Sequence, residues 1–527
     1  MNNKKKLETY ELLFKYFGPG ESETTLADVA TALGCTSRHA RTLLQQMSAL
    51  EWLVWQPEPG RGKRSLLVCN QEPINACYQL MEDALEAGKH ESVFKLAGFN
   101  DRHVSSELKK YLISSTQYDS QAIRIPFHRE IKTLHPHYAF DRTERHLILH
   151  VFQRLTEDDF GEIKPSLAHH WESDEEGRNW TFYLQSGVQY QDQTPMKVED
   201  IVLSLQVLIN NPYWRSLYEH IESIDVLSPE SIRISLSRPD WHLAALLGRS
   251  EASIMPSQYG RLIINPEAPV GSGSFMIDIA SSRLFRLKRN NNYSGKCALI
   301  ENIELWIHPD WAKDKLCSEG SFFLDQPEQT YITTCNDVGY FYMMIKKPQL
   351  RDRIVSKAII DVLQEKRLIL GEIHYPITFS YDDNNECRYY AQLLDQALAN
   401  HQHVTSTCVS FGEQQKEADI SLGGIRIEGC SLTSLLAFFY TYSLWSQILS
   451  QPLYQKLLVL LHQAQATQDK QQAEGVLRSI LTWLSDDRIL TMIRQESFKL
   501  TAPLKIQGIR VNNVGWCDFS KLWVKSH

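Results

Sequence analysis

The 527-residue sequence contains no run of apolar residues long enough to cross a bilayer. A membrane-spanning helix needs about 20 predominantly apolar residues. The most apolar stretch, Leu432 to Trp445, is shorter and is interrupted by two threonines and two serines. We therefore expect no membrane partner and assign this stretch to a protein core.

A secretory leader is not apparent at the N-terminus either. Lys4 to Lys6 resemble the basic start of a signal peptide, but Glu8 and Glu11 interrupt the apolar segment that would have to follow. The ten cysteines are scattered and never form a C-x2-C pair. We therefore expect reduced thiols and a cytoplasmic protein.

Motifs for catalysis and metal binding are missing as well. The sequence has no G-x-S-x-G, and no other nucleophile motif recruits a base. His135, His137, His169 and His170 form two close pairs, but no H-E-x-x-H and no nearby cysteine or acid spacing completes a metal-ligand set. We interpret these histidines as solvated or core residues, and we expect no enzyme activity and no cofactor.

The overall composition is that of a globular protein, with 43% hydrophobic and 22% charged residues. The chain is too long for one hydrophobic core, which indicates at least two domains. The net charge of −8 argues against a protein that coats nucleic acid with its whole surface. A small basic module can still be hidden in this average.

Residues 1–70 have the pattern of a helix-turn-helix. Leu7 to Phe17 and Leu26 to Leu33 predict two helices by their apolar spacing, and Gly34 stands where a C-cap glycine belongs. Hydroxyl side chains in the short turn that follows can cap the next helix. The buried stripe of that helix is predicted from Ala40, Leu43, Leu44, Met47 and Leu50.

The other face of this third helix and a following hairpin predict DNA binding. Two predicted strands, 52–55 and 65–68, enclose a turn that holds three cations. A lone polar helix face is usually just solvated, but here helix, tight turn, helix and basic wing occur in order. We therefore predict a winged helix that binds a double-stranded DNA operator. The predicted contacts are Ser37, Arg38, His39, Arg41, Thr42, Gln45 and Gln46 on the helix, and Arg61, Lys63 and Arg64 on the wing.

Residues 71–115 predict a helical connector. Cys77, Leu80, Met81 and Leu85 form an apolar seam in this charge-rich segment. The alternative interpretation of the seam is a contact between two copies of the chain in a homodimer.

The rest of the chain predicts α/β lobes, because strands and helices alternate over some 400 residues. The predicted strands are 180–184, 231–236, 283–288, 303–307, 340–345 and 419–422. The predicted helices are 198–209, 350–363 and 391–399.

Several motifs in this region resemble oligopeptide-type solute-binding proteins of family 5. They are PSLAHHW at 165–171, WTFYLQSGVQY at 180–190, VEDIV at 198–202, PVGSGSF at 269–275 and RNNNY at 289–293. Their order over roughly 350 residues is similar to the order in that family. The resemblance implies a two-lobed clamp, like that of periplasmic binding proteins, that closes on a ligand.

The combination of this clamp with a winged helix resembles the SgrR family over nearly the whole chain. The matching segments are ARTLL at 40–44, GRGKRS at 60–65, AHHW at 168–171 and NVGW at 513–516. The resemblance implies a cytoplasmic transcription regulator, associated with sugar-phosphate stress, that senses a small metabolite. The runner-up interpretation is a solute- or peptide-binding protein of an ABC transporter.

The resemblance also implies lobe boundaries and a ligand site. Lobe I would comprise 116–335 plus 488–527, and lobe II would comprise 336–487. The implied ligand residues are Trp214, Tyr218, Ser272, Arg426 and Glu428. Arg426 would suit a phosphate group, as in a phosphosugar, whereas a peptide-like effector would need an acid such as Glu428. As alternatives, Arg426 and Glu428 pair with each other, Ser272 only shapes a turn, and the two aromatic residues belong to the core.

Overall fold

A computed structural model divides the chain into two compact units. The first comprises Met1–Asp119, Pro126–His128 and Trp306–Trp311, and the second comprises the remaining residues. No helix among the described residues is long and apolar enough to cross a membrane. The structure describes residues 3–58, 63–99, 104–116, 121–258, 260–263, 269–312, 319–321, 330–366, 377–398, 404–409, 418–427, 430–442, 444–512 and 514–525.

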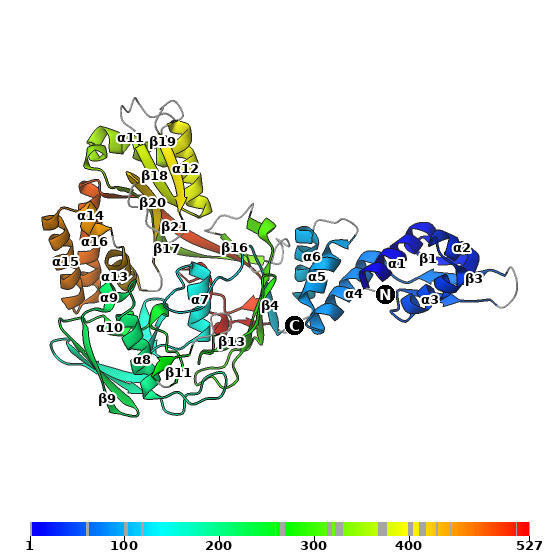
Figure 1. Cartoon of the computed structure of the whole chain (residues 1–527), viewed down its shortest axis with the longest axis horizontal. Helices are drawn as coiled ribbons and strands as arrows, with labels where there is room; N and C mark the ends of the chain where they lie inside the picture. Colours follow the sequence, from blue (N-terminus) through cyan, green and yellow to red (C-terminus); the bar gives the residue numbers. More distant parts are fainter. Residues whose placement is uncertain are drawn as a thin grey trace. The chain divides into compact units, whose positions relative to one another are not determined.

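The N-terminal part of the first unit is a winged helix (Figure 1). Strand β3 lies between β1 and β2 and pairs antiparallel with both. The predicted helices and the hairpin are confirmed, whereas β1 was not predicted. The elements are α1 (Asn3–Phe17), β1 (Gly20–Thr24), α2 (Leu26–Ala32), α3 (Ser37–Ser48), β2 (Leu53–Gln56) and β3 (Ser65–Cys69).

Local capping positions helices α2 and α3. Thr25 and Asp28 form a reciprocal capping box at the start of α2. Gly34 has a φ of +59°, the left-handed conformation that glycine adopts without strain after a helix. The Thr36 hydroxyl then accepts a hydrogen bond from the His39 backbone N–H at 3.3 Å, which caps α3.

Three helices, α4 (Pro73–Glu86), α5 (His90–Ala97) and α6 (Val104–Thr116), form the predicted helical connector. Its apolar seam is internal, because Cys77, Leu80 and Met81 are buried within the single chain. The Cys77 thiol donates to the Leu96 carbonyl at 3.4 Å. These seam residues are therefore not exposed for contact with a second copy, and the homodimer stays a prediction.

The second unit is built around three larger sheets (Figure 1). An antiparallel sheet has the order β7 (Ala168–Ser173), β8 (Asn179–Leu184), β10 (Ser231–Leu236) and β9 (Ile221–Ser228). Another has the order β13 (Phe275–Ala280), β14 (Leu284–Arg289), β15 (Asn302–Ile307) and β4 (Ala122–Phe127). A mixed sheet has the order β16 (Glu319–Ser321), β21 (Leu490–Pro503), β17 (Thr330–Ile345), β20 (Ile420–Arg426), β18 (Ile377–Asp382) and β19 (Val404–Val409).

Helices cover these sheets. The hairpin of β5 (Thr156–Asp159) and β6 (Glu162–Pro165) follows helix α7 in the chain. The helices of the unit are α7 (Arg142–Val151), α8 (Val198–Ile209), α9 (Arg215–Tyr218), α10 (Leu243–Leu246), α11 (Arg353–Leu363), α12 (Asn385–Ala397), α13 (Ser431–Thr441), α14 (Trp445–Ile448), α15 (Gln451–Ala466) and α16 (Lys470–Asp486).

One hydrophobic core joins distant parts of the second unit. It extends from Leu155 to Leu490 and combines the β7–β10 sheet with α13, α15 and α16. The apolar stretch 432–445 lies largely in this core, as predicted. A separate cluster packs α11 and α12 against the mixed sheet. The first core contains residues from both predicted lobes, and the lobe boundaries stay a prediction.

A buried polar network also connects α13 and α15 to the β9–β10 region. Asp240 Oδ2 lies 2.9 Å from His220 Nε2 and accepts a 2.8 Å hydrogen bond from Gln465 Nε2. Tyr440 OH donates to Gln465 Oε1 at 2.8 Å. Asp240, His220 and Gln465 are fully buried. Each hydrogen bond in this network joins residues that are at least 20 positions apart in the chain.

Candidate functional sites

The first candidate site is the outer face of α3. Its inner face holds Ala40, Leu43, Leu44 and Met47, which are buried as predicted, whereas Leu50 follows the end of α3 and is only half-buried. The outer face leaves two guanidinium groups in solvent, and no carboxylate among the described residues pairs with either of them. The exposed side chains there are Ser37, Arg38, His39, Arg41, Thr42 and Gln45.

Gln46 differs from its neighbours on α3. It is half-buried, and its Oε1 is enclosed and has no hydrogen-bond partner among the described residues. The structure therefore places six of the seven predicted helix contacts on one exposed face and turns Gln46 toward the interior.

The wing contributes further positive charge. Lys63 and Arg64 are exposed at the start of β3. Lys63 Nζ lies 3.8 Å from Glu58 Oε2 in a solvent-exposed pair, which is worth little energetically and leaves the lysine available. Arg61, the third predicted wing contact, lies outside the described residues.

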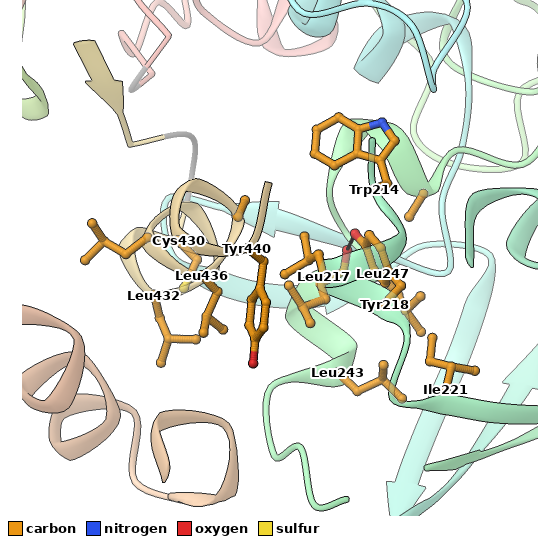
Figure 2. Packing of buried hydrophobic residues seen from close by; sticks show 14 of the residues in the cluster. Trp214, Leu217, Tyr218, Ile221, Leu243, Leu247, Cys430, Leu432, Leu436 and Tyr440 are labelled. Carbon is orange, nitrogen blue, oxygen red and sulfur yellow. Dashed lines mark hydrogen bonds between the residues drawn. The ribbon is translucent and has the colours of Figure 1, made fainter. Parts of the chain in front are cut away.

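In the second unit, Trp214 and Tyr218 lie in the hydrophobic core (Figure 2). Trp214 donates through Nε1 to the His137 carbonyl at 3.1 Å. Tyr218 OH lies 3.2 Å from Glu251 Oε1. Both rings are at most 2% exposed. Neither residue lines the cavity described below, although the centre of the Trp214 ring lies 5.3 Å from the guanidinium carbon of Arg145 in its wall.

The histidines of the two close pairs in the sequence occupy different environments. His169 and His170 are exposed on β7, and His137 is buried. No three histidine, cysteine or acidic side chains gather as a metal-binding group in the part of the chain that the structure describes.

Ser272 lies in a glycine-rich turn that packs against the end of α7. A Cβ atom on Gly273 would lie 2.2 Å from the His150 carbonyl oxygen, so only glycine allows this approach. Gly273 N–H donates to the Val151 carbonyl at 2.8 Å. Ser272 is fully buried, and its Oγ has no hydrogen-bond partner among the described residues. Its neighbours Gly273 and Ser274 line the cavity.

Of the other two predicted ligand residues, the structure describes only the backbone of Arg426. Arg426 ends strand β20, where its backbone pairs with Gly339 of β17. Its side chain and the whole of Glu428 lie outside the described residues.

A cavity of about 170 Å³ is the second candidate site. Its wall comes from α7, the β5–β6 hairpin, the turn after α10, the glycine-rich turn and the C-terminal segment 512–521. The charged residues in the wall are Arg145, Arg154, Glu157, Asp158, Asp159, Arg249, Asp518 and Lys521. The site is therefore a polar enclosure that carries charges of both signs.

Two of the arginines are neutralised in part by one carboxylate behind the wall. Glu251 Oε2 lies 2.8 Å from Arg145 Nη2, and Glu251 Oε1 lies 2.5 Å from Arg249 Nε. Glu251 is fully buried. Burial alone would raise its pKa, but the two guanidinium groups hold that pKa below its ordinary value. This triad has two positive charges and one negative charge.

Arg154 has no carboxylate at ion-pair distance among the described residues, although the charges of Glu157 and Asp518 favour its protonated form. It is only 6% exposed, and its Nη1 donates to the carbonyl groups of Leu149 and Phe152 at 3.3 and 3.0 Å. Its Nε is buried without a hydrogen-bond partner, and no carboxylate among the described residues forms an ion pair with it. Burial lowers the pKa of this guanidinium.

Two histidines of α7 form the opposite part of the wall. His146 Nε2 and His150 Nε2 are 3.3 Å apart, and His150 stacks on Phe519. Burial lowers the pKa of His150 to about 4 and that of His146 well below its usual range. Both imidazoles are therefore neutral near pH 7 and add no positive charge to the cavity.

No local sequence pattern predicted this cavity. Its charged residues are separated by up to 376 positions, from Arg145 to Lys521. One local signal was present in Arg154, a charged residue between the buried apolar residues Phe152 and Leu155. A charge inside such a run indicates either a buried partner or a binding site.

Two family descriptions match the chain. "Sugar transport-related sRNA regulator N-term", abbreviated SgrR_N, matches residues 5–119. "Bacterial extracellular solute-binding proteins, family 5 Middle" matches residues 162–334. The first match covers the winged helix and the helical connector, and the second begins at the β5–β6 hairpin and ends within β17.

Similar sequences extend over nearly the whole chain. The HTH-type transcriptional regulator SgrR of Escherichia coli O1:K1 / APEC is 26% identical, with 95% of each chain covered. The uncharacterized protein YbaE of Escherichia coli K12 is 25% identical, with 98% of each chain covered.

Solved structures share the fold of the large unit. The periplasmic binding protein DppA of Helicobacter pylori has a TM-score of 0.61 at 14% identity and covers 79% of this chain and 100% of its own. The dipeptide-binding protein of Pseudoalteromonas sp. SM9913 has a TM-score of 0.62 at 15% identity, with 76% and 100% covered. The predicted fold class is thereby confirmed.

Both domain types occur here in one chain, with the SgrR_N match before the family 5 match. The chain is therefore similar to the SgrR regulators over nearly its whole length and combines an SgrR_N domain with a family 5 solute-binding domain.

Proposed function

We propose that this protein is a cytoplasmic transcription regulator that binds operator DNA through its winged helix and senses a small metabolite in its solute-binding unit. The observation that carries the proposal is the outer face of α3. Arg38 and Arg41 are exposed there without carboxylate partners, on a helix whose inner face is fixed in the core. Arginine side chains on such a face suit guanine edges and phosphates in a major groove.

The solute-binding unit supplies the sensing function. Its fold is shared with proteins that hold small ligands, and its cavity is lined by buried charged groups. Ser272, Arg426 and Glu428 remain our proposed ligand contacts, with a sugar phosphate as the proposed effector. Binding can shift DNA affinity only if the effector prefers one conformation, and typical coupling is about 1–3 kcal/mol.

The DNA-binding face can be tested by two arginine substitutions. Genomic fragments retained by the wild-type protein would serve as probes in fluorescence anisotropy titrations. We expect Arg41→Ala to cost about 1–3 kcal/mol of binding free energy if Arg41 contacts a base, and the Arg38→Ala/Arg41→Ala double variant to cost more. Lys63→Ala should weaken binding to all fragments alike and make the salt dependence less steep.

Lys15→Ala is the matched control, because Lys15 is an exposed cation on α1 that pairs with Glu11 rather than lying on α3. It should bind DNA like the wild type. Unchanged binding by the double arginine variant would contradict the assignment of α3. Recovery of the native protein from the periplasm, without retained DNA, would favour the transport-type alternative.

A further inference from the structure

The cavity contains a buried cation that forms no ion pair with the described residues, although the charges of Glu157 and Asp518 act on it. Arg154 is more than nine-tenths buried, yet it contacts only two backbone carbonyl groups. Transferring a charged group from water into a protein interior is costly unless it is paired and hydrogen-bonded. Arg145 and Arg249, in the same wall, satisfy that rule through Glu251. Arg154 is the exception among the described arginines of this wall.

We propose that the cavity is a binding site for a small hydroxylated organic anion, whose anionic group occupies the space beside Arg154. This inference depends on the proposed function, because it identifies the chemical class of the effector. The two proposals differ in the residue that binds the anionic group, which is Arg154 in this inference and Arg426 in the proposed function.

The free hydrogen-bond donors of Arg154 support an anionic group. The guanidinium of Arg154 has donors left over after its two contacts, since Nε has no partner among the described residues. A carboxylate or phosphate accepts two parallel hydrogen bonds from a guanidinium.

The other polar residues support hydroxyl groups on the ligand. Glu157 and Asp158 line the same cavity, and burial raises the pKa of both carboxyl groups. Ser274 and Tyr293 add hydroxyl groups to the wall. Carboxyl and hydroxyl oxygens accept hydrogen bonds from ligand hydroxyls.

The volume limits the size of the ligand. The cavity measures about 170 Å³, and an engineered cavity of about 150 Å³ holds one benzene molecule. A short-chain anion such as glycerol 3-phosphate or D-glycerate is of comparable size. These two compounds present the same hydroxylated skeleton with a phosphate or a carboxylate, so they distinguish the two sources of negative charge.

Calorimetric titration of the full chain at constant ionic strength tests the proposal. The probes are glycerol 3-phosphate, D-glycerate, uncharged glycerol and cationic 3-amino-1,2-propanediol. We expect at least one of the two anions to bind the wild type more tightly than glycerol does. Arg154→Met should weaken that binding about 10- to 100-fold, because one charge-assisted contact of about 1.5–3 kcal/mol is lost.

Three further variants control for indirect effects. Arg154→Lys keeps the charge and should retain part of the affinity. Arg154→Gln can still donate to a backbone carbonyl, so it provides a second neutral variant if Arg154→Met does not fold. Arg233→Met removes an exposed arginine from β10, outside the cavity, and should bind like the wild type. Thermal unfolding without ligand shows which variants are folded.

The outcomes separate this inference from the proposed function. Equal anion affinity in wild type and Arg154→Met, binding of only glycerol or the amine, or binding of neither anion would overturn the inference. DNA binding is measured on the same samples. A wild type that binds the anion at Arg154 but binds no DNA would leave the anion site intact and overturn the proposed function instead.

Discussion

Replacing Asp240 with alanine should lower the free energy of unfolding of the larger unit by about 3–5 kcal/mol, the usual cost of removing one partner from a buried charged network. The Asp240 carboxylate lies 2.9 Å from His220 Nε2 and accepts from Gln465 Nε2 and from the His242 backbone N–H. Alanine would leave these groups buried without an acceptor. Although burial alone raises the pKa of Asp240, the hydrogen bond from His220 and nearby histidines hold it below its ordinary value.

Denaturant titration followed by tryptophan fluorescence measures this loss. Asp225→Ala is the matched control, because Asp225 is an exposed aspartate on the neighbouring strand β9. Exposed substitutions usually change stability by less than about 0.5 kcal/mol. Equal unfolding curves for Asp240→Ala and Asp225→Ala would show that the network contributes nothing to the stability of the unit.

Acidification from pH 6.5 to pH 4 should destabilise the larger unit by about 3 kcal/mol for each deeply buried histidine. Burial lowers the pKa of His137 and of His150 from 6.5 to about 4. Between these values the unfolded chain binds more protons than the folded chain. The stabilisation is therefore present above pH 6.5 and is lost as the pH falls toward 4.

The charged neighbours differ between the two histidines. His150 faces Asp518, which favours its protonation, and Arg154, which opposes it. His137 lies near Glu251, which favours its protonation, and near His135, which opposes it.

His137→Phe tests the acid prediction, because neither ring nitrogen of His137 has a hydrogen-bond partner among the described residues. The variant should remove about 1.4 kcal/mol per pH unit from the slope of stability against pH between 6.5 and 4. His169→Gln alters an exposed histidine and should leave the slope unchanged. If stability fell with pH as steeply in His137→Phe as in the wild type, other groups would cause the acid sensitivity.

The sequence was most informative where side-chain spacing and local turns determine structure. The stripe from Ala40 to Met47 predicted which face of α3 is buried, and the glycine at position 34 marked the end of α2. Strand β1 escaped prediction because Gly20–Thr24 has no apolar alternation and is held only by pairing with β3. Strand β17 begins ten residues before the predicted 340–345, because its first part is polar and pairs with β21.

The cavity could not be predicted from local patterns. Arg154, Tyr293 and Lys521 become neighbours only when α7, the segment after β14 and the C-terminal segment pack together. A resemblance to solute-binding proteins indicated a ligand site, but it directed attention to Trp214 and Tyr218, which are core residues. The sign of charge in a ligand site depends on which carboxylates reach which arginines, and that depends on tertiary packing.

Residues Trp306–Trp311 belong to the first unit although they follow much of the second unit in the sequence. This order has a consequence for protein synthesis. Trp306 lies 5.9 Å from Phe94, ring to ring, and both side chains are buried. Ribosomes add about 5–20 residues per second, so the 212 residues between them take roughly 10–40 s. Throughout that interval Phe94 in the emerging helical connector lacks its partner Trp306, so we expect the nascent chain to bind chaperones and residues 1–119 expressed alone to aggregate.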